Sequence, residues 1–343
     1  MGQEINELFN TPEGCDLVVE NVEGKIEITG WDKPQTQVIA VKHNERPEVE
    51  ISQDGRKVIA RTRFEQEPLG FLNWFTNGRS NGAVDYTIYV PHNSNVKVKH
   101  VNGPIKAVQI NGNLDLHGVD GPTQVSQVSG DIHIHTVNGS VMAEALQGSA
   151  KLNAVNGKLK VKNSTLQSLT SETVNGEIEA QAALNPEGRY HLKTVNGGCR
   201  LTVQEGFRAR VSAKGINLSV KTSLPTQAVE KHFGHWHGII GSGDGPTAEI
   251  TFDTVNGSLR INDGEEVTIP FAPPAPPTPP MPPAPPAPPA PPQAPEWSES
   301  KPVMVKVEGS AKTDGPKTKT EVLEMIERGE ITVSEGLKLL ENL

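Results

Sequence analysis

Residues 101–157 read VNGPIKAVQINGNLDLHGVDGPTQVSQVSGDIHIHTVNGSVMAEALQGSAKLNAVNG, and this stretch decides the fold. Within it an apolar residue, a polar residue and a glycine recur at intervals of nine, in the units Val101-Asn102-Gly103, Ile110-Asn111-Gly112, Val119-Asp120-Gly121, Val128-Ser129-Gly130, Val137-Asn138-Gly139, Leu146-Gln147-Gly148 and Val155-Asn156-Gly157. Self-similarity at one unbroken spacing over seven units is the signature of a repeat protein.

The residues of each unit describe a turn followed by a short strand. Asn-Gly and Asp-Gly accept a positive φ at little cost, so they mark turns. Positions 5 and 7 of the unit are mostly apolar, as in Leu114 and Leu116 or Ile132 and Ile134, with Thr123 as an exception. This period of two puts both side chains on one face of a strand, and stacked neighbours must bury that face. The sequence therefore predicts an all-β solenoid.

The second residue of the unit indicates how many units make one coil. Asn recurs in the odd units, whereas the even units vary: Asn102, Asn138 and Asn156 against Asn111, Ser129 and Gln147. This favours a coil of 18 residues whose two dissimilar nine-residue halves lie on two facing sheets. A three-sided coil of six-residue rungs also contains 18 residues but leaves the period of nine unexplained. A meander of hairpins is the other alternative, because Asn-Gly is the strongest short hairpin signal.

The composition limits what the chain binds and where it resides. Aromatic residues make up 4% of it, so the stacked core must be built from aliphatic side chains. The net charge of −9 argues against a nucleic-acid partner, which needs clustered Lys and Arg. No apolar run reaches the ~18 residues of a membrane span, and residues 1–7 lack the basic and apolar segments of a secretory signal. We therefore expect no transmembrane segment and a cytoplasmic protein, with the periphery of the membrane as an alternative.

Changes of pattern along the chain predict its domains. Alternating strand patterns in residues 1–94 predict an N-terminal β region that caps the solenoid. The solenoid repeats occupy residues 95–269, and an insertion interrupts them at about 222–246.

The composition and the sequence pattern both change after residue 269. Residues 270–317 form a proline-rich and polar linker, since most of the 28 prolines lie there as Pro-Pro-X repeats typical of a polyproline II spacer. Residues 318–343 predict a small α-helical hairpin, because Thr318 with Glu321 and Thr332 with Glu335 form capping boxes. Two such short helices need a partner surface, which suggests self-association or capture of another protein.

Two segments outside the seven units, together with those units, give the main part of the chain a resemblance to a known family. They are Gly24-Lys25-Ile26-Glu27-Ile28-Thr29-Gly30-Trp31-Asp32 and Tyr86-Thr87-Ile88-Tyr89-Val90-Pro91. Residues 15–262 resemble the bacterial "putative adhesin" family, a domain of unknown function with a β-solenoid-like fold. The resemblance implies a binding protein and supplies no catalytic residues.

The tail resembles a second, smaller module. The segment Glu321-Val322-Leu323-Glu324-Met325-Ile326-Glu327-Arg328-Gly329-Glu330-Ile331-Thr332 and the residues after it are similar to the SHOCT-like helical hairpin of LiaX/YvlB-type envelope-stress proteins. In that family the hairpin is N-terminal, so its place here is a departure. The resemblance implies a link to stress of the bacterial cell envelope.

The sequence offers few residues with a chemical role. A polysaccharide-acting enzyme of the β-helix type needs clustered acids, yet Asp115 and Asp131 occupy different places in their units. We therefore expect no catalytic residue and no cofactor. His117 and His135 share position 8 of units 18 residues apart, so they should stack on adjacent coils, with His133 beside them on a polar face.

The insertion contains the one candidate for metal binding. His232, His235 and His237 with Asp244 would supply ligands if the loop folded back, but a loop with three histidines is weak evidence without supporting residues. No metal site is therefore assigned. Cys199 stands at position 5 of its unit, which predicts a buried structural thiol.

Candidate interaction residues lie where the repeat is interrupted or extended. They come from an aromatic loop, the insertion and the tail: Trp74, Phe75, Trp236, Val322, Ile326, Leu337 and Leu340. Taken together, the sequence predicts a non-enzymatic, adhesin-like scaffold that binds a protein or an envelope polymer. The alternatives are a bactofilin-like cytoskeletal polymer and a β-helix enzyme that acts on polysaccharide.

Overall fold

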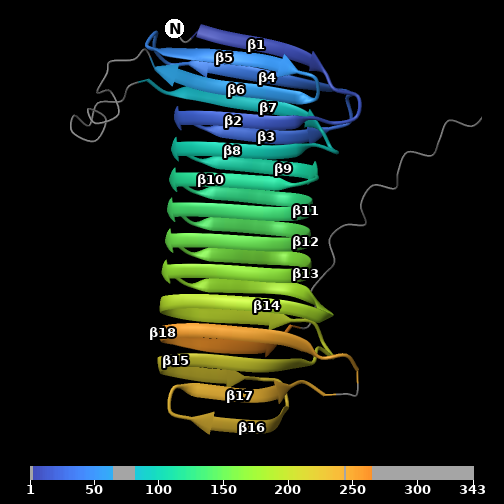
Figure 1. The fold of residues 1–343 in the computed structure, drawn as a ribbon, viewed down its shortest axis with the longest axis vertical. Coiled ribbons are helices and arrows are strands. Elements are labelled where there is room, and N and C mark those ends of the chain that lie inside the picture. The colour runs from blue at the N-terminus through green and yellow to red at the C-terminus, as the bar shows by residue number, and fades with distance from the viewer. Residues whose placement is uncertain (1–2, 65–81, 243–244, 265–343) are drawn as a thin grey trace, which may run out of the picture. The chain divides into compact units, whose positions relative to one another are not determined.

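The computed structural model describes residues 3–64, 82–242 and 245–264, which form a stack of β-strands (Figure 1). The chain divides into two units, residues 1–278 and 279–343, and every described residue belongs to the first. The described residues form 18 strands and no helix, so none of them forms a helix that could cross a membrane. The all-β prediction is confirmed for this part, whereas the linker and the helical hairpin lie outside it.

The central strands stack in parallel, with equivalent positions of successive coils opposite each other. They are β8 (Asn95–Asn102), β9 (Ile105–Asn111), β10 (Leu114–Asp120), β11 (Thr123–Asn138), β12 (Val141–Asn156), β13 (Leu159–Asn175) and β14 (Ile178–Val203). Leu114 lies opposite Ile132, and Ile105 lies opposite Thr123. Parallel pairing excludes a meander of hairpins, and two strand segments in each coil exclude three-sided rungs. The 18-residue coil is therefore confirmed.

Each coil contributes one strand segment to each of two sheets. We call the sheet that contains β9 and residues 123–129 the β9 face, and the sheet that contains β10 and residues 132–138 the β10 face. Positions 5 and 7 of the units meet between them, as Leu114 does at 1% exposure. A thin aliphatic core thus runs through the stack, as the low aromatic content predicts.

The first residue of the unit is buried at only one of the two corners. Val128 and Leu146 of even units are 1% exposed, whereas Val119 of an odd unit is 37% exposed. The residue before each even unit has a left-handed φ, as Gln127 and Ala145 do at 55°. This conformation interrupts the alternation of the strand and turns the next side chain inward. The two halves of a coil are dissimilar for this reason.

Glycine at the odd corner is required by the close approach of successive coils. The Gly139 amide donates a hydrogen bond to the Asn156 carbonyl of the next coil, at 3.1 Å. On its other side, a Cβ on Gly139 would lie 2.0 Å from the carbonyl oxygen of Gly121. No side chain fits there, so the repeated glycine fixes the spacing of the coils.

The asparagine of the odd unit forms a ladder along the same edge. The Asn138 amide donates to the Asp120 carboxylate at 2.8 Å, and Asn156 donates to Asn138 at 2.9 Å. The same side-chain bond recurs on later coils, at 2.5–3.2 Å, through Asn175, Asn196, Asn256 and Asn217. This ladder explains why Asn recurs in the odd units.

The N-terminal strands extend the solenoid before they cap it. They are β1 (Gln3–Asn10), β2 (Asp16–Glu23), β3 (Ile26–Trp31), β4 (Gln35–Lys42), β5 (Pro47–Asp54), β6 (Lys57–Phe64) and β7 (Val84–Pro91). β2 pairs in parallel with β8 and β3 with β9, so residues 16–31 already form a coil and the expected start at residue 95 is too late. β6 and β7 follow in parallel, and β1, β4 and β5 end the stack with antiparallel pairing.

The C-terminal end changes the order of the strands. It contains β15 (Ala209–Thr222), β16 (Thr226–His232), β17 (His235–Ile240) and β18 (Ala248–Asp263). β18 lies between β14 and β15, and Asn256 is opposite both Asn196 and Asn217. The insertion expected at about 222–246 therefore begins earlier, at β15, which supplies a further coil. The antiparallel hairpin of β16 and β17 ends the stack.

The glycine corners predict a position-specific loss of stability. Gly139→Ala should lower the free energy of unfolding by about 2 kcal/mol, because its Cβ has no space. Gly118→Ala is the control, since the nearest atom to its Cβ would be 3.6 Å away. Urea titrations followed by tryptophan fluorescence give both midpoints. Equal midpoints for the two variants would refute this account of the corner.

The left-handed positions predict a gain of stability. Ala145→Gly should raise the free energy of unfolding by up to about 1 kcal/mol, because glycine adopts its φ of 55° without strain. Ala154→Gly is the control: Ala154 is 6% exposed in a strand with ordinary φ, and its variant should lose stability. Thermal unfolding of both variants measures the difference. A lower melting temperature for Ala145→Gly would contradict the prediction.

Candidate functional site

Most of the interaction residues expected from sequence cannot be placed. Trp74, Phe75, Val322, Ile326, Leu337 and Leu340 lie outside the described residues, as does Asp244. For these positions the expectations from sequence stand as predictions.

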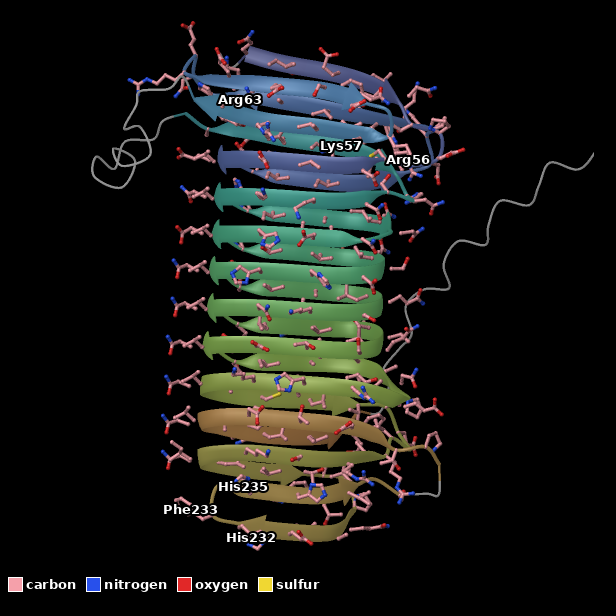
Figure 2. All side chains as sticks on the ribbon, in the orientation of Figure 1. Arg56, Lys57, Arg63, His232, Phe233 and His235 are labelled. Atoms are coloured by element: carbon pink, nitrogen blue, oxygen red, sulfur yellow. The ribbon has the colours of Figure 1, made fainter. Side chains whose placement is uncertain are left out.

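The histidines of the insertion lie on the terminal hairpin of β16 and β17, and Figure 2 labels His232 and His235. His232 is opposite His235 across the β16–β17 turn, where Phe233 is 92% exposed. His237 follows two residues later on the same face and lies opposite Glu230. Among the described residues, no three His, Cys, Asp or Glu side chains are arranged to hold a metal ion. All three histidines are exposed, so the hairpin presents them as surface residues.

Trp236 has a structural role in the hairpin. Its side chain is 7% exposed and belongs to the core, because it alternates with His235 and His237 along β17. Ala213 of β15 lies opposite it. Trp236 is expected from the sequence to be an interaction residue, but it lies one position out of phase with His235 and His237, so the strand points its indole inward.

The β10 face carries the histidine stack that the sequence predicts. His117 lies opposite His135, with ring centroids 6.1 Å apart, and His133 lies opposite Asp115. The Asp115 carboxylate accepts hydrogen bonds from Lys97 at 2.8 Å and from His117 Nε2 at 2.9 Å. Partial burial raises the pKa of Asp115, but the Lys97 hydrogen bond and the His117 charge outweigh it and leave the pKa below its usual value. This carboxylate is a partner for cations and not a proton donor.

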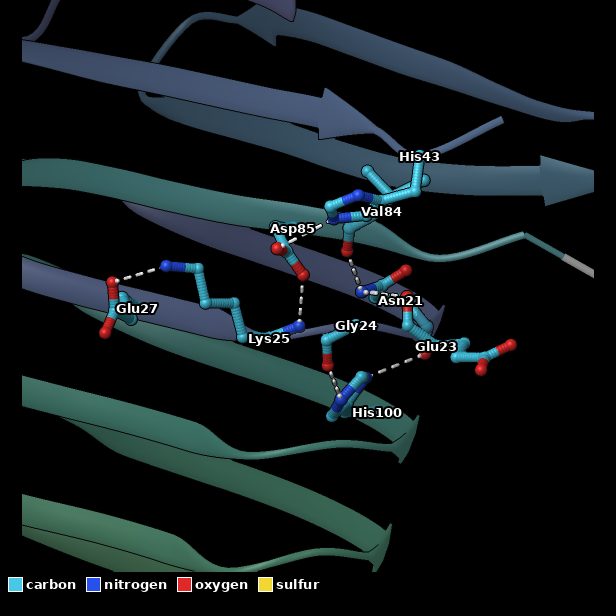
Figure 3. Close-up of polar contacts among 9 residues, drawn as sticks. All are labelled: Asn21, Glu23, Gly24, Lys25, Glu27, His43, Val84, Asp85 and His100. Atoms are coloured by element: carbon cyan, nitrogen blue, oxygen red, sulfur yellow. Dashed lines mark hydrogen bonds and ion pairs between the residues drawn. The ribbon is translucent and has the colours of Figure 1, made fainter. Parts of the chain in front are cut away.

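A buried polar cluster joins the N-terminal coil to β7 and β8 (Figure 3). The Asn21 amide donates to the Val84 carbonyl at 2.8 Å. His100 places Nε2 2.9 Å from the Gly24 carbonyl and Nδ1 3.3 Å from the Asn21 carbonyl. Burial lowers the pKa of His100, and the two carbonyls oppose that shift only in part. A neutral imidazole has one N–H, so only one of these carbonyls receives a hydrogen bond.

Sequence inspection missed His100, although its place in the repeat gives a signal. It precedes Val101-Asn102-Gly103, where Thr136, Thr173 and Thr194 precede later Val-Asn-Gly units. The Thr194 hydroxyl donates to the Gly176 carbonyl of the preceding coil, at 3.4 Å. His100 thus fills, with a larger side chain, a position that contacts the glycine corner of the preceding coil.

An open groove of about 370 Å³ adjoins the polar cluster of Asn21 and His100. It is lined by Glu23, Gly24, Lys25, Ala83, Asp85, Asn102, Gly103 and Pro104. The Asp85 carboxylate already accepts a hydrogen bond from the Lys25 amide at 2.8 Å, and its other oxygen is 2.9 Å from His43 Nε2. The Asp85 carboxylate is therefore occupied in holding the corner together.

Both cysteines are buried and unpaired. Cys15 is 0% and Cys199 is 2% exposed, which confirms the burial predicted for Cys199. Burial raises the pKa of the Cys199 thiol, and the charge of Glu177 adds to this effect. Burial also raises the pKa of Cys15, although hydrogen bonds to Thr36 and Ser94 offset part of the shift. Neither thiol has the depressed pKa of a nucleophile.

The buried thiols predict a slow reaction with an aromatic disulfide reagent. The folded protein at pH 8 should release almost no thionitrobenzoate, because thiolate formation and access are both suppressed. In urea both cysteines should react within seconds. Absorbance at equal protein concentration compares the two states. Rapid labelling of the folded protein would show that one of the thiols is accessible.

Known proteins resemble the part of the chain that contains the coils. A crystal structure of a "putative cell adhesion protein" from Clostridium sporogenes is 10% identical with a TM-score of 0.28, and the alignment covers 77% of this chain and 100% of that chain. A "putative adhesin" from Bacteroides fragilis is 11% identical with a TM-score of 0.39, covering 76% and 97%. No curated protein matches. The family model described as Toastrack DUF4097 matches residues 15–262, and the chain therefore belongs to that family.

Proposed function

We propose that the protein is a non-enzymatic β-solenoid scaffold that binds a protein or an envelope polymer in an adhesin-like manner. The observation that carries this proposal is the continuous register of its outward side chains. On the β10 face one such row runs across consecutive strands: Glu20, Lys99, His117, His135, Asn153, Glu172, Lys193, Asp253 and Lys214. Parallel strands hold these groups ~4.8 Å apart, so an extended partner meets many fixed contacts at once.

The ends of the stack favour a discrete molecule over a polymer. β5 begins with Pro47, and its neighbours Glu48 and Glu50 place charge at that edge. β16 is exposed throughout, and a register shift between Gln227 and Glu230 distorts it. Proline, charge and irregular pairing all hinder the addition of another strand. These features weigh against the bactofilin-like alternative.

The carboxylates give little support to the polysaccharide-acting enzyme. Such enzymes need one carboxylic acid with a raised pKa beside an ionised partner. Glu20, Asp115 and Glu179 all have a pKa below the usual value of a carboxyl group. Burial raises the pKa of Glu20 and Asp115, but their cationic partners outweigh it, and the hydrogen bond from Lys158 has the largest effect on the pKa of Glu179. These three acids therefore balance neighbouring cations.

The tail supplies the second part of the proposal. The hairpin at residues 318–343 would serve self-association or partner capture, held away from the solenoid by the linker at residues 270–317. The support is the pair of capping boxes and the resemblance to the SHOCT-like module. A role in envelope stress is proposed on that resemblance.

Comparing the full chain with a version that ends at Pro270 tests the proposal. Light scattering should show discrete particles for both, with the larger assembly confined to the full chain if the hairpin self-associates. Both should bind bacterial envelope material without releasing reducing ends, because binding belongs to the solenoid. Filaments in negative-stain images, or released sugar, would refute the proposal.

A further inference from the structure

Three cations form an uninterrupted row at the C-terminal end of the β9 face. Arg200 of β14 lies opposite Arg260 of β18, and Arg260 lies opposite Lys221 of β15. Their chain neighbours Leu201 and Ile261 are 0–1% exposed, so the alternation of the strands directs the cations outward. We call Arg200, Arg260 and Lys221 the basic row. Strand spacing sets its charges ~4.8 Å apart.

Packing does not account for this row. Like charges directly opposite each other on neighbouring strands destabilise a sheet. Several cations on other strands do meet acids: Lys97 pairs with Asp115 at 2.8 Å, Arg61 with Glu20 at 2.6 Å and Lys160 with Glu179 at 3.3 Å. None of the three cations of the basic row forms an ion pair with another described residue. The row carries a cost in stability that an anionic ligand would remove.

The side chains beside the row narrow the chemistry of that ligand. Ser258 and Ser219 are opposite each other on one side, and Thr202 and Asn262 are opposite each other on the other. All four bear hydroxyl or amide groups that donate and accept hydrogen bonds. A polymer with many hydroxyl groups and regularly placed anionic groups matches this combination. A lipid surface would need apolar side chains there, and a nucleic acid would need a larger basic area.

We propose that the basic row binds a linear anionic glycan, whose carboxylate or phosphate groups recur along the polymer and lie along the stack of strands. The two arginines engage these groups with paired N–H donors, and Lys221 supplies a point charge. Flanking hydroxyl and amide groups bond to the sugar hydroxyls. This inference rests on the proposed scaffold function and names the partner of one of its faces.

The test compares two triple variants of the full chain with equal changes of charge. The first variant removes the charges of the basic row by Arg200→Gln, Arg260→Gln and Lys221→Gln. The control variant carries Lys57→Gln, Lys151→Gln and Lys231→Gln, three exposed lysines that lie outside the basic row and outside the row of outward side chains on the β10 face, and that form no ion pair with another described residue. Far-UV circular dichroism checks the fold of each protein, and the single variant Arg260→Gln serves if the triple variant does not fold.

Binding is measured by interferometry on immobilised polygalacturonate at two salt concentrations. Losing three charge-assisted contacts should weaken the affinity at least about tenfold, while the control changes it less than about threefold. The dependence of this affinity on salt concentration should also become weaker, and only for the variant that lacks the basic row. Dextran, poly-glutamate and vesicles with anionic phosphatidylglycerol provide neutral, peptide and lipid comparisons.

Equal losses of affinity for polygalacturonate in both triple variants would overturn the proposal, because they would indicate non-specific electrostatic attraction and no defined site. It would also fail if poly-glutamate or vesicles bound more tightly than polygalacturonate, or if polygalacturonate did not bind. In each case the scaffold function would survive if envelope material still bound the protein that ends at Pro270. Loss of that binding would instead remove the scaffold function itself.

Discussion

The backbone ladder between successive coils is the interaction on which the rest of the structure depends. Each inner strand segment satisfies its amides and carbonyls on the coils before and after it, so the register must hold along the stack. The corners enforce this register: Gly139 admits the neighbouring coil at 2.0 Å from where its Cβ would lie, and Asn138 bonds to Asp120 and Asn156. A slip of one residue would turn Leu116 outward and empty the core. Glycine and asparagine are therefore architectural in this chain.

A stack built in this way has open ends, and the chain closes them with antiparallel strands. At the N-terminal end β1, β4 and β5 perform this role, and at the C-terminal end the β16–β17 hairpin does so. At the C-terminal end, the chain forms β15 at a distance from β14 and returns later with β18, which fills the position between them. Closing the stack thus brings together Arg200, Arg260 and Lys221, which no continuous run of repeats would have placed in one row.

The side chains that are available to a partner lie on the exposed faces of the sheets. The groove at the N-terminal corner is lined by groups that already hold the turn together, such as Asp85 with His43. The thiols are buried, and the Asp115 carboxylate serves Lys97 and His117. What remains available are rows of side chains at fixed spacing, and binding through such rows suits a member of the Toastrack family whose fold is a rigid stack of strands.

Sequence alone determined the features that depend on local spacing. The nine-residue period fixed the 18-residue coil, the inward Leu114 and Leu116, the stack of His117 on His135 and the burial of Cys199, because these follow from the alternation of a strand and the recurrence of a turn. Only the tertiary structure decided the rest. The left-handed φ of Gln127 separates buried from exposed valines, the place of β18 between β14 and β15 creates the basic row, and the pairing of β17 with β15 buries Trp236. These outcomes depend on which strands become neighbours, and the contacts that choose them join residues far apart in the chain.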